Sequence, residues 1–259
     1  MMSELKFAIP KGSLEKKMLA FFEKAGLTTK GYADGSRGYR PDLGIPGISA
    51  KVLRPQEIPY MLAAGFYDMG ISGLDWYLES ESAPNVADLL DLGVGRVDIV
   101  LAVPQAWEDI NTTADLFEKF IDSTSTHPLR LWTEYLNLAE GLVRKYTDLE
   151  PSLYTPYSRL HVERSSSSPV AIFHSFGATE SKPPEDGDAI IDNTETGRTL
   201  RANGLKIIDK IVPDSTARLL VNRRSLRNKD KQAMIYRVRD ALMTAAPQRR
   251  EEEPVFGHI

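Results

Sequence analysis

A run of small polar residues after an apolar segment carries the clearest chemistry in this sequence. Ala189–Leu200 reads AIIDNTETGRTL, in which three apolar residues lead to Asp192 and then to a loop with three threonines, a glycine and an arginine. Hydroxyl groups and the backbone N–H groups at a helix start are donors that suit a phosphate. Gly197 lets the backbone approach the anion because it has no Cβ. The segment predicts a strand–loop–helix phosphate site; a threonine-capped turn without a ligand is the alternative.

Asp192 stands at the end of the predicted strand, directly before the phosphate loop. A carboxylate at that point can accept hydrogen bonds from ribose hydroxyls, or hold Mg²⁺ directly or through water. Ligands of open α/β sheets bind at the carboxyl ends of strands, where this residue is expected. We therefore expect Asp192 to bind a sugar or a metal ion.

Strand-to-helix junctions near the N-terminus carry further candidate residues. Lys11 and Gly12 follow the apolar segment Leu5–Ile9. They combine a cation with a backbone free of Cβ, which suits a pyrophosphate, although a turn with a solvated lysine explains them equally well. Arg54 ends another predicted strand, where its forked donors can clamp a phosphate or form a surface ion pair.

A third junction is formed by Gly73, Leu74 and Asp75, which can face a nucleotide. Asp75 alone is explained equally well as an acidic residue in the first turn of a helix, where the helix dipole favours it.

Alternating strand and helix signals position these junctions. The expected strands are Leu5–Ile9, Ser49–Leu53, Tyr67–Ser72, a long β-rich stretch at Leu92–Pro104, Leu129–Thr133, Val170–Phe173, Ala189–Asp192, Leu205–Ile211 and Ala217–Asn222. The expected helices follow Ser13 and Leu74 and cover Pro55–Ala64, Leu136–Tyr146, Leu200–Asn203 and Asp230–Ala246. Strands separated by helices indicate βαβ units and a largely parallel sheet. Between Thr147 and Pro169 the Pro, Ser and Tyr content predicts a surface loop.

The composition excludes several classes of protein. The net charge of -4 argues against a general nucleic-acid coat, which needs a basic surface. The absence of cysteine excludes a disulfide scaffold and a thiolate nucleophile. The four histidines lack metal-ligand spacing, and no apolar run reaches the length of a membrane span. We expect a cytoplasmic enzyme that binds neither nucleic acid nor membrane.

Several segments resemble one enzyme family. The segment DAIIDNTETGRTLRANGLKII resembles the corresponding part of the ATP phosphoribosyltransferases, which open histidine biosynthesis. Further similar segments follow in the order found in that family: LKFAIPKGSL, LRPQEIPYMLAAGFYDMGISGLDW, LLDLGVGRVDIVLAVP, LWTEYLNLA, FGATE and STARLLVNRRSL. The resemblance covers most of residues 5–245. Several motifs in the right order are far more specific than one loop.

The resemblance implies an α/β fold with two domains of the type II periplasmic-binding-protein-like kind and an active site in the cleft between them. Domain I is expected to be discontinuous, at 1–96 plus 212–246; domain II is expected at 97–211 and carries the phosphoribosyl-binding loop; 247–259 is a tail. The implied reaction joins N1 of ATP to C1 of phosphoribosyl pyrophosphate (PRPP), with Mg²⁺ present, and releases pyrophosphate. It needs no covalent nucleophile, and no acid or base residue is assigned.

The resemblance also implies roles for single residues. PRPP binding is expected from Asp192, Thr194, Glu195, Thr196, Gly197, Arg198, Thr199, Lys11 and Gly12, with Asp192 also a candidate Mg²⁺ ligand. ATP binding, or a place in the cleft, is expected for Arg54, Gly73, Leu74, Asp75, Glu180 and Arg37. The chain departs from the family at Glu134, where many members carry lysine, and at Ser13, where many carry arginine. A phosphate-binding role is therefore not carried over to either position.

The expected partners follow from the same resemblance. Only a short tail follows Ala246, so the chain is similar to the short form of the family, which depends on a separate regulatory subunit resembling a histidyl-tRNA synthetase. We expect a homo-oligomer, a dimer or larger. The alternative is a non-catalytic small-ligand-binding protein of the same two-lobed fold, or a specialised paralogue, to which the insertion around 147–169 would belong.

Overall fold

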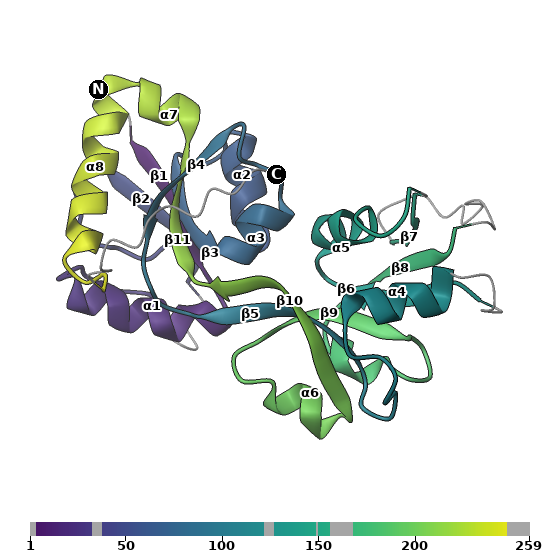
Figure 1. Cartoon of the computed structure of the whole chain (residues 1–259). Coiled ribbons are helices and arrows are strands. Elements are labelled where there is room, and N and C mark those ends of the chain that lie inside the picture. Colours follow the sequence, from purple (N-terminus) through teal and green to yellow (C-terminus); the bar gives the residue numbers. More distant parts are fainter. Residues whose placement is uncertain (1–3, 33–37, 122–126, 149, 156–167, 248–259) are drawn as a thin grey trace. The chain divides into compact units, whose positions relative to one another are not determined.

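The computed structural model describes residues 4–32, 38–121, 127–148, 150–155 and 168–247 of the chain (Figure 1). The chain divides into two compact units. The first contains Met1–Ser72, Ala83–Gly95 and Thr216–Ile259, and the second contains Gly73–Ser82 and Arg96–Ser215. Each unit has its own sheet and its own hydrophobic core.

The first unit is built on a five-stranded sheet of order β2-β1-β3-β11-β4. Its strands are β1 (Leu5–Pro10), β2 (Ile48–Leu53), β3 (Met69–Gly73), β4 (Val86–Asp91) and β11 (Ala217–Asn222). β1 runs parallel to β2 and to β3, and β11 runs antiparallel to β4. Pro10 is in register with Leu53, so Lys11 and Arg54 leave neighbouring strands at the same edge.

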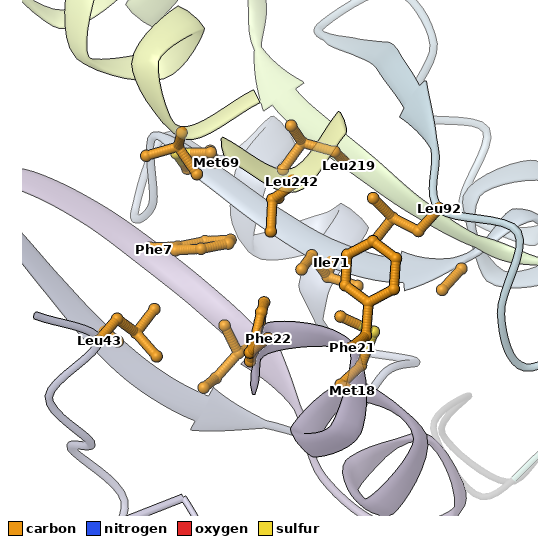
Figure 2. Packing of buried hydrophobic residues seen from close by; sticks show 14 of the residues in the cluster. Phe7, Met18, Phe21, Phe22, Leu43, Met69, Ile71, Leu92, Leu219 and Leu242 are labelled. Carbon is orange, nitrogen blue, oxygen red and sulfur yellow. The ribbon is translucent and has the colours of Figure 1, made fainter. Parts of the chain in front are cut away.

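Helices of the first unit pack against this sheet, and most of them bury apolar side chains there. They are α1 (Ser13–Lys24), α2 (Ile58–Ala63), α7 (Arg223–Arg227) and α8 (Lys229–Met243). Leu14, Met18, Phe21 and Phe22 are buried at the three- and four-residue spacing that puts them on one face of α1. Figure 2 shows how Met18, Phe21 and Phe22 meet residues of the strands and of α8. The labelled residues are Phe7, Met18, Phe21, Phe22, Leu43, Met69, Ile71, Leu92, Leu219 and Leu242.

The second unit is built on a six-stranded sheet of order β10-β5-β9-β6-β8-β7. Its strands are β5 (Val97–Pro104), β6 (Leu129–Thr133), β7 (Ser152–Tyr154), β8 (Val170–His174), β9 (Ala189–Thr194) and β10 (Leu205–Ser215). β6 is parallel to β8 and β9, whereas β5 is antiparallel to β9 and β10. Therefore β6, β8, β9 and β10 all end at one edge of the sheet, where β5 begins.

Short helices cover the second sheet: α3 (Leu74–Glu79), α4 (Thr113–Ile121), α5 (Leu136–Val143), the 3₁₀ turn η1 (Thr179–Ser181) and α6 (Arg198–Ala202). Glu79 at the end of α3 accepts hydrogen bonds from the backbone N–H groups of Asn137 (2.9 Å) and Leu138 (3.0 Å), at the start of α5. Burial raises the pKa of Glu79 to about 7, although these N–H groups act in the opposite direction. Glu79 thus supplies α5 with the N-terminal acceptor that its own sequence lacks.

The expected order of strands and helices is confirmed for most elements. β6 and β11 have the predicted bounds. The helix predicted at Pro55–Ala64 begins later, at Ile58, and the one predicted from Leu200 begins earlier, at Arg198. Propensity places such boundaries poorly, because the last hydrogen bonds at a helix end depend on the surrounding fold.

Other elements correct the expectations from sequence. Leu92–Pro104 is not one β-rich stretch: Gly93 and Gly95 adopt φ values of 68° and 73° and turn the chain before β5 begins at Val97. β4 and α4 were not expected at all, although α4 carries its buried residues at helical spacing. The predicted loop after Thr147 contains the short strand β7, and residues 156–167 lie outside the described residues.

The segment Gly73–Ser82 lies in the second unit, whereas the expected division places it in the first domain. Within the second unit, Trp76 of α3 stacks on Tyr135 with a centroid distance of 4.3 Å, and Glu79 binds α5. These contacts attach α3 to the second core. The domain division as a whole stays a prediction.

Trp107 packs beside Phe120, and Trp132 stacks on Phe173, so these tryptophans serve in packing. No helix among the described residues has both the length and the apolar character to cross a membrane.

Asp68 is a buried carboxylate that ties β3 to three other elements of the first unit. It accepts hydrogen bonds from Lys231 Nζ (2.7 Å), Ser225 Oγ (2.6 Å) and the backbone N–H of Lys6 (2.9 Å). Burial raises the pKa of Asp68, but the hydrogen bonds from Lys231, Lys6 and Ser225 outweigh it, so the pKa lies below its ordinary value. The ionised form is therefore the one that stabilises the fold.

We expect Asp68→Asn to destabilise the protein by about 1–3 kcal/mol at pH 7, because the lysine loses its charged partner. The stabilisation is complete above the pKa of the unfolded chain and is lost as the pH falls through the lower folded value. Thermal unfolding should therefore show a difference between variant and wild type that shrinks below about pH 4. Asp240→Asn, at an exposed carboxylate of the same unit, is the control. Equal melting temperatures at pH 7 would contradict the assignment.

Candidate functional site

A pocket of about 480 Å³ lies in the second unit, and it is polar. Its lining residues are Glu134, Gly177, Ala178, Thr179, Glu180, Asp192, Asn193, Thr194, Glu195, Thr196, Arg198, Thr199 and Leu200. They come from three segments of the chain, and each segment directly follows, or ends, one strand. The volume is within the range of pockets that hold small-molecule ligands.

The direction of the strands explains why these segments meet. Glu134 follows β6, Gly177–Glu180 follow β8, and Asp192–Leu200 lead from β9 into α6. β6 lies between β8 and β9 and is parallel to both, so the three carboxyl ends lie next to one another. This is the edge at which open α/β sheets bind ligands.

The loop after β9 is held by its own hydrogen bonds. The backbone N–H of Gly197 donates to Thr194 Oγ1 at 2.8 Å, and Arg201 Nη2 donates to the Thr196 carbonyl at 2.9 Å. Gly197 has a φ of 68°, a left-handed conformation that side chains disfavour. A Cβ there would also lie 2.8 Å from Arg201 Nη1. The left-handed backbone at position 197 therefore requires glycine.

The pocket holds more negative than positive charge. Glu134, Glu180, Asp192 and Glu195 line it, and Arg198 is the cation among its lining residues. Burial raises the pKa of Asp192 to about 7; the N–H of Asn193, 2.8 Å from Asp192 Oδ1, opposes this, and the charges of Glu180 and Glu134 add to it. The pocket therefore suits a ligand that donates hydrogen bonds to carboxylates, as sugar hydroxyls do.

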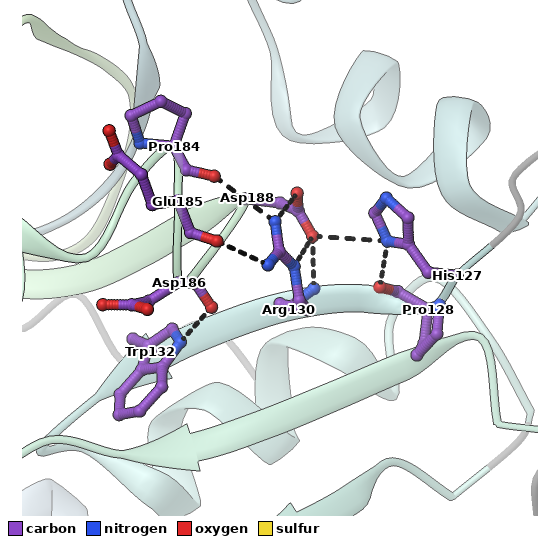
Figure 3. Close-up of polar contacts among 8 residues, drawn as sticks. All are labelled: His127, Pro128, Arg130, Trp132, Pro184, Glu185, Asp186 and Asp188. Carbon is purple, nitrogen blue, oxygen red and sulfur yellow. Dashed lines mark hydrogen bonds and ion pairs between the residues drawn. The ribbon is translucent and has the colours of Figure 1, made fainter.

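An ion pair fixes the chain between the two pocket segments that follow β8 and β9. Asp188, directly before β9, is buried and accepts hydrogen bonds from Arg130 Nε (3.1 Å) and Nη2 (3.0 Å) (Figure 3). Arg130 Nη1 also donates to the Glu185 carbonyl at 2.9 Å. His127 Nδ1 lies 3.8 Å from Asp188 Oδ2. The guanidinium on β6 thus anchors the chain that enters β9.

No group of three or more His, Cys, Asp or Glu residues among the described residues is arranged to hold a metal ion. Mg²⁺ commonly binds through one or two carboxylates together with phosphate oxygens of a substrate and water. Asp192, whose carboxylate lines the pocket beside Glu180, fits that kind of site.

Comparison with known proteins decides the family. A family model described as HisG, ATP phosphoribosyltransferase, matches residues 54–243. The chain belongs to the ATP phosphoribosyltransferase family. An ATP phosphoribosyltransferase from Brucella ovis is 34% identical over 241 residues, which are 91% of this chain and 97% of that relative. One from Prosthecochloris aestuarii is 34% identical over 226 residues, or 85% of this chain, and here the match spans 64% of the relative's length.

Solved structures agree on the fold. A chain of the ATP phosphoribosyl transferase (HisG:HisZ) complex from Thermotoga maritima has a TM-score of 0.67 at 24% identity, covering 93% of this chain and 98% of that one. The periplasmic aliphatic sulphonate binding protein SsuA from Escherichia coli has a TM-score of 0.51 at 13% identity, covering 94% and 72%. The predicted fold class, α/β of the type II periplasmic-binding-protein-like kind, is confirmed.

The structure brings one group of predicted residues of this ATP phosphoribosyltransferase family member together. Asp192, Thr194, Glu195, Thr196, Arg198 and Thr199 line the pocket with Glu180, while Gly197 shapes its loop. Glu134, at which the sequence carries over no phosphate-binding role, lines the same pocket. Their roles toward a ligand stay predictions.

Other predicted residues lie in the first unit and do not line this pocket. Lys11 follows β1 with its Nζ 3.3 Å from Tyr39 Oη and 4.5 Å from the centre of that ring. Gly12 precedes α1 with a φ of 81°, a backbone conformation that requires glycine at this position. Arg54 is exposed after β2. Arg37 lies outside the described residues.

The third junction buries its carboxylate within the second unit. Gly73 ends β3 and Leu74 begins α3, but the Asp75 side chain is only 4% exposed. Its Oδ1 accepts from Ser215 Oγ and its Oδ2 from Tyr135 Oη, each at 2.8 Å. Both hydrogen bonds hold this carboxylate within the protein, and its expected role toward a nucleotide stays a prediction. The alternative, an acidic residue in the first helical turn, agrees with the structure.

Two residues at the pocket were not singled out from the sequence. Asn193 lines the pocket beside Asp192, and Tyr135 lies buried beneath it, 3.3 Å from Asn193 Nδ2. The available signal was their position, since Asn193 follows Asp192 and Tyr135 directly follows Glu134. Only the pairing of β6 with β9 brings the two together.

Because the pKa of Asp192 is raised in the folded protein, the stability of the protein should depend on pH. Between the unfolded pKa, about 3.9, and the folded value of about 7, the folded state holds a proton that the unfolded chain releases, so stability falls as the pH rises through this window. Asp192→Asn removes that cost. At pH 8 we expect its free energy of unfolding to exceed that of the wild type by about 1–3 kcal/mol, which raises its melting temperature. Near pH 4 the two melting temperatures should be equal.

The control for this measurement is Glu195→Gln, at an exposed carboxylate of the same loop. It should leave the melting temperature unchanged at both pH values. A destabilised Asp192→Asn protein at pH 8 would show that the ionised carboxylate stabilises the fold, contrary to this assignment.

Proposed function

We propose that this chain transfers the phosphoribosyl group of PRPP to N1 of ATP, giving phosphoribosyl-ATP and pyrophosphate. The C1–N1 bond forms, the bond from C1 to the pyrophosphate oxygen breaks, and its electron pair leaves with the pyrophosphate. The observation that carries the proposal is the pocket formed by the ETGRTL loop and Asp192 in a member of this family.

The two halves of the pocket match the two ends of a phosphoribosyl group. Thr196, Arg198 and Thr199 are exposed on the loop and offer hydroxyl and guanidinium donors to the 5-phosphate. Asp192 and Glu180 offer acceptors to the ribose hydroxyls. Such contacts hold C1 for attack, and positioning of this kind accounts for much of the acceleration in displacements without a covalent intermediate. Lys11, Gly12 and Arg54 are proposed to bind phosphates of the substrates.

Mg²⁺ is the proposed cofactor. Bound with the donor, it would neutralise charge on the departing pyrophosphate. Asp192 would hold it, directly or through water, and the acidic surroundings of Asp192 favour a cation there.

The proposed partner is a HisZ-like regulatory subunit resembling a histidyl-tRNA synthetase. It is supported by the fold neighbour from Thermotoga maritima, which is a chain of a HisG:HisZ complex. A homo-oligomeric state and a cytoplasmic location stay predictions.

The activity test mixes the protein with ATP, PRPP and Mg²⁺, adds pyrophosphatase to draw the reaction forward, and follows phosphoribosyl-ATP by ultraviolet absorbance. It is run with and without a HisZ-like subunit. Product in either arm supports the proposal. PRPP binding without product in both arms would instead indicate a non-catalytic binding protein.

The loop predicts a selective loss of donor binding. Gly197→Val combined with Thr199→Ala should raise the KM for PRPP about tenfold or more, since the left-handed backbone at 197 and a hydroxyl of the pocket are both lost. The KM for ATP should change little. Gly204→Ala is the matched control, because Gly204 has a similar φ of 70° but does not line the pocket. Equal donor KM values in the double variant and the control would contradict the loop assignment.

A further inference from the structure

A chain of buried hydrogen bonds leads from the end of β10 to the pocket. It begins at Ser215, the last residue of that strand, whose Oγ donates to Asp75 Oδ1 at 2.8 Å. The backbone N–H of Asp75 donates back to Ser215 Oγ at 3.0 Å. Ser215 and Asp75 are 1% and 4% exposed, so these bonds are shielded from water. They fix the position of the Asp75 carboxylate.

The next link is Tyr135, which is fully buried and stacks on Trp76. Its hydroxyl donates to Asp75 Oδ2 at 2.8 Å. A phenol has one proton to donate, and Asp75 takes it, so the hydroxyl oxygen can only accept from any other neighbour. Asn193 Nδ2, at 3.3 Å, is that neighbour. With Asp75 ionised, the directions of the two hydrogen bonds of Tyr135 are thereby determined.

The last link reaches the pocket. Asn193 donates to Asp192 Oδ1 twice, from its backbone N–H at 2.8 Å and more weakly from Nδ2 at 3.4 Å. Both bonds go to the same oxygen, and Asp192 Oδ2 accepts no hydrogen bond from the described residues. The amide of Asn193 thus orients the carboxylate and leaves its second oxygen for a ligand.

Gly73 shows how closely this arrangement is packed. A Cβ at Gly73 would lie 2.0 Å from Asp75 Oδ1, and that oxygen is held by Ser215 and cannot move away. The glycine, two residues before the carboxylate, is therefore a requirement of the hydrogen-bond chain.

We propose that Tyr135 and Asn193, held by Asp75, are positioning residues that orient Asp192 toward the ribose hydroxyls of the donor. This inference rests on the proposed function, since it names how the donor's sugar is recognised. The hydroxyl of Tyr135 touches no ligand in this scheme and acts only through Asn193 and Asp192.

The test is a double-mutant cycle on PRPP binding, measured by isothermal titration calorimetry with Mg²⁺ present. Tyr135→Phe and Asn193→Ala should each raise the Kd for PRPP about three- to fivefold, because the bonds at 3.3 and 3.4 Å are lost while the backbone bond of residue 193 to Asp192 remains. Combined with Asp192→Asn, which has already lost the carboxylate, each should add less than about twofold, because residues in one network are not additive. The KM for ATP should not change.

The control is Thr113→Val, which removes a 2.7 Å bond between Thr113 Oγ1 and Asp209 in the same unit, away from the pocket. It should leave the PRPP Kd unchanged. If each variant raises the Kd for PRPP as much in the Asp192→Asn background as in the wild type, the positioning role is overturned and a general loosening of the fold is indicated. Asn193 is exposed, so Asn193→Ala keeps the test valid if Tyr135→Phe does not fold.

A second readout separates this inference from the proposed function. If wild-type protein does not bind PRPP, the proposed function fails; crystal structures of the wild type and of both variants then decide on the hydrogen-bond chain. The Asp192 carboxylate should keep one orientation in the wild type and turn away from it in both variants, because the Asn193 side chain no longer holds it. An unchanged orientation in both variants would overturn the inference.

Discussion

The parallel pairing of β6 with both β8 and β9 is the constraint on which the pocket depends. Parallel neighbours end at the same edge, so the residues after each strand meet there whatever their separation in sequence. Glu134 and Asp192 are 58 positions apart and line one pocket for this reason. The ion pair between Arg130 and Asp188 secures the same pairing at the opposite ends of the strands, before the chain enters β9.

The charge of the pocket sets a second constraint. Asp192 is half-buried, and both its partial removal from water and the charges of Glu180 and Glu134 oppose its ionisation. Costs of this kind are typical of binding sites, where the ligand later supplies the missing partners. Burial also raises the pKa of Asp75, but this carboxylate accepts hydrogen bonds from two hydroxyl groups within the protein, which act in the opposite direction. Two carboxylates at one edge of a sheet therefore have different tasks.

Much of the site could be predicted because its residues are adjacent in the chain. The loop from Asp192 to Thr199 combines a strand end, a glycine and several donors within eight residues, and local chemistry indicates its use. Helical spacing likewise predicted α1, and apolar runs predicted β6 and β11. The contacts of Asp75 could not be predicted, because its position in a helical turn gives no information on what lies opposite. Tyr135 and Asn193 were missed because each is unremarkable in its own segment.

The sequence by itself determined the family, the fold class and the phosphate loop, since these depend on residue order and on contacts within a few positions. Only the tertiary structure decided which acids share the pocket and what lies beneath it. Ser215, Asp75, Tyr135 and Asn193 are far apart in the chain, and their hydrogen bonds exist because strands and helices place them within about 3 Å of one another. Because hydrogen bonds form only over such short distances, the separation of two residues in the sequence does not predict whether they form one. The loop could be predicted from the sequence, whereas the chain of contacts that orients its carboxylate could not.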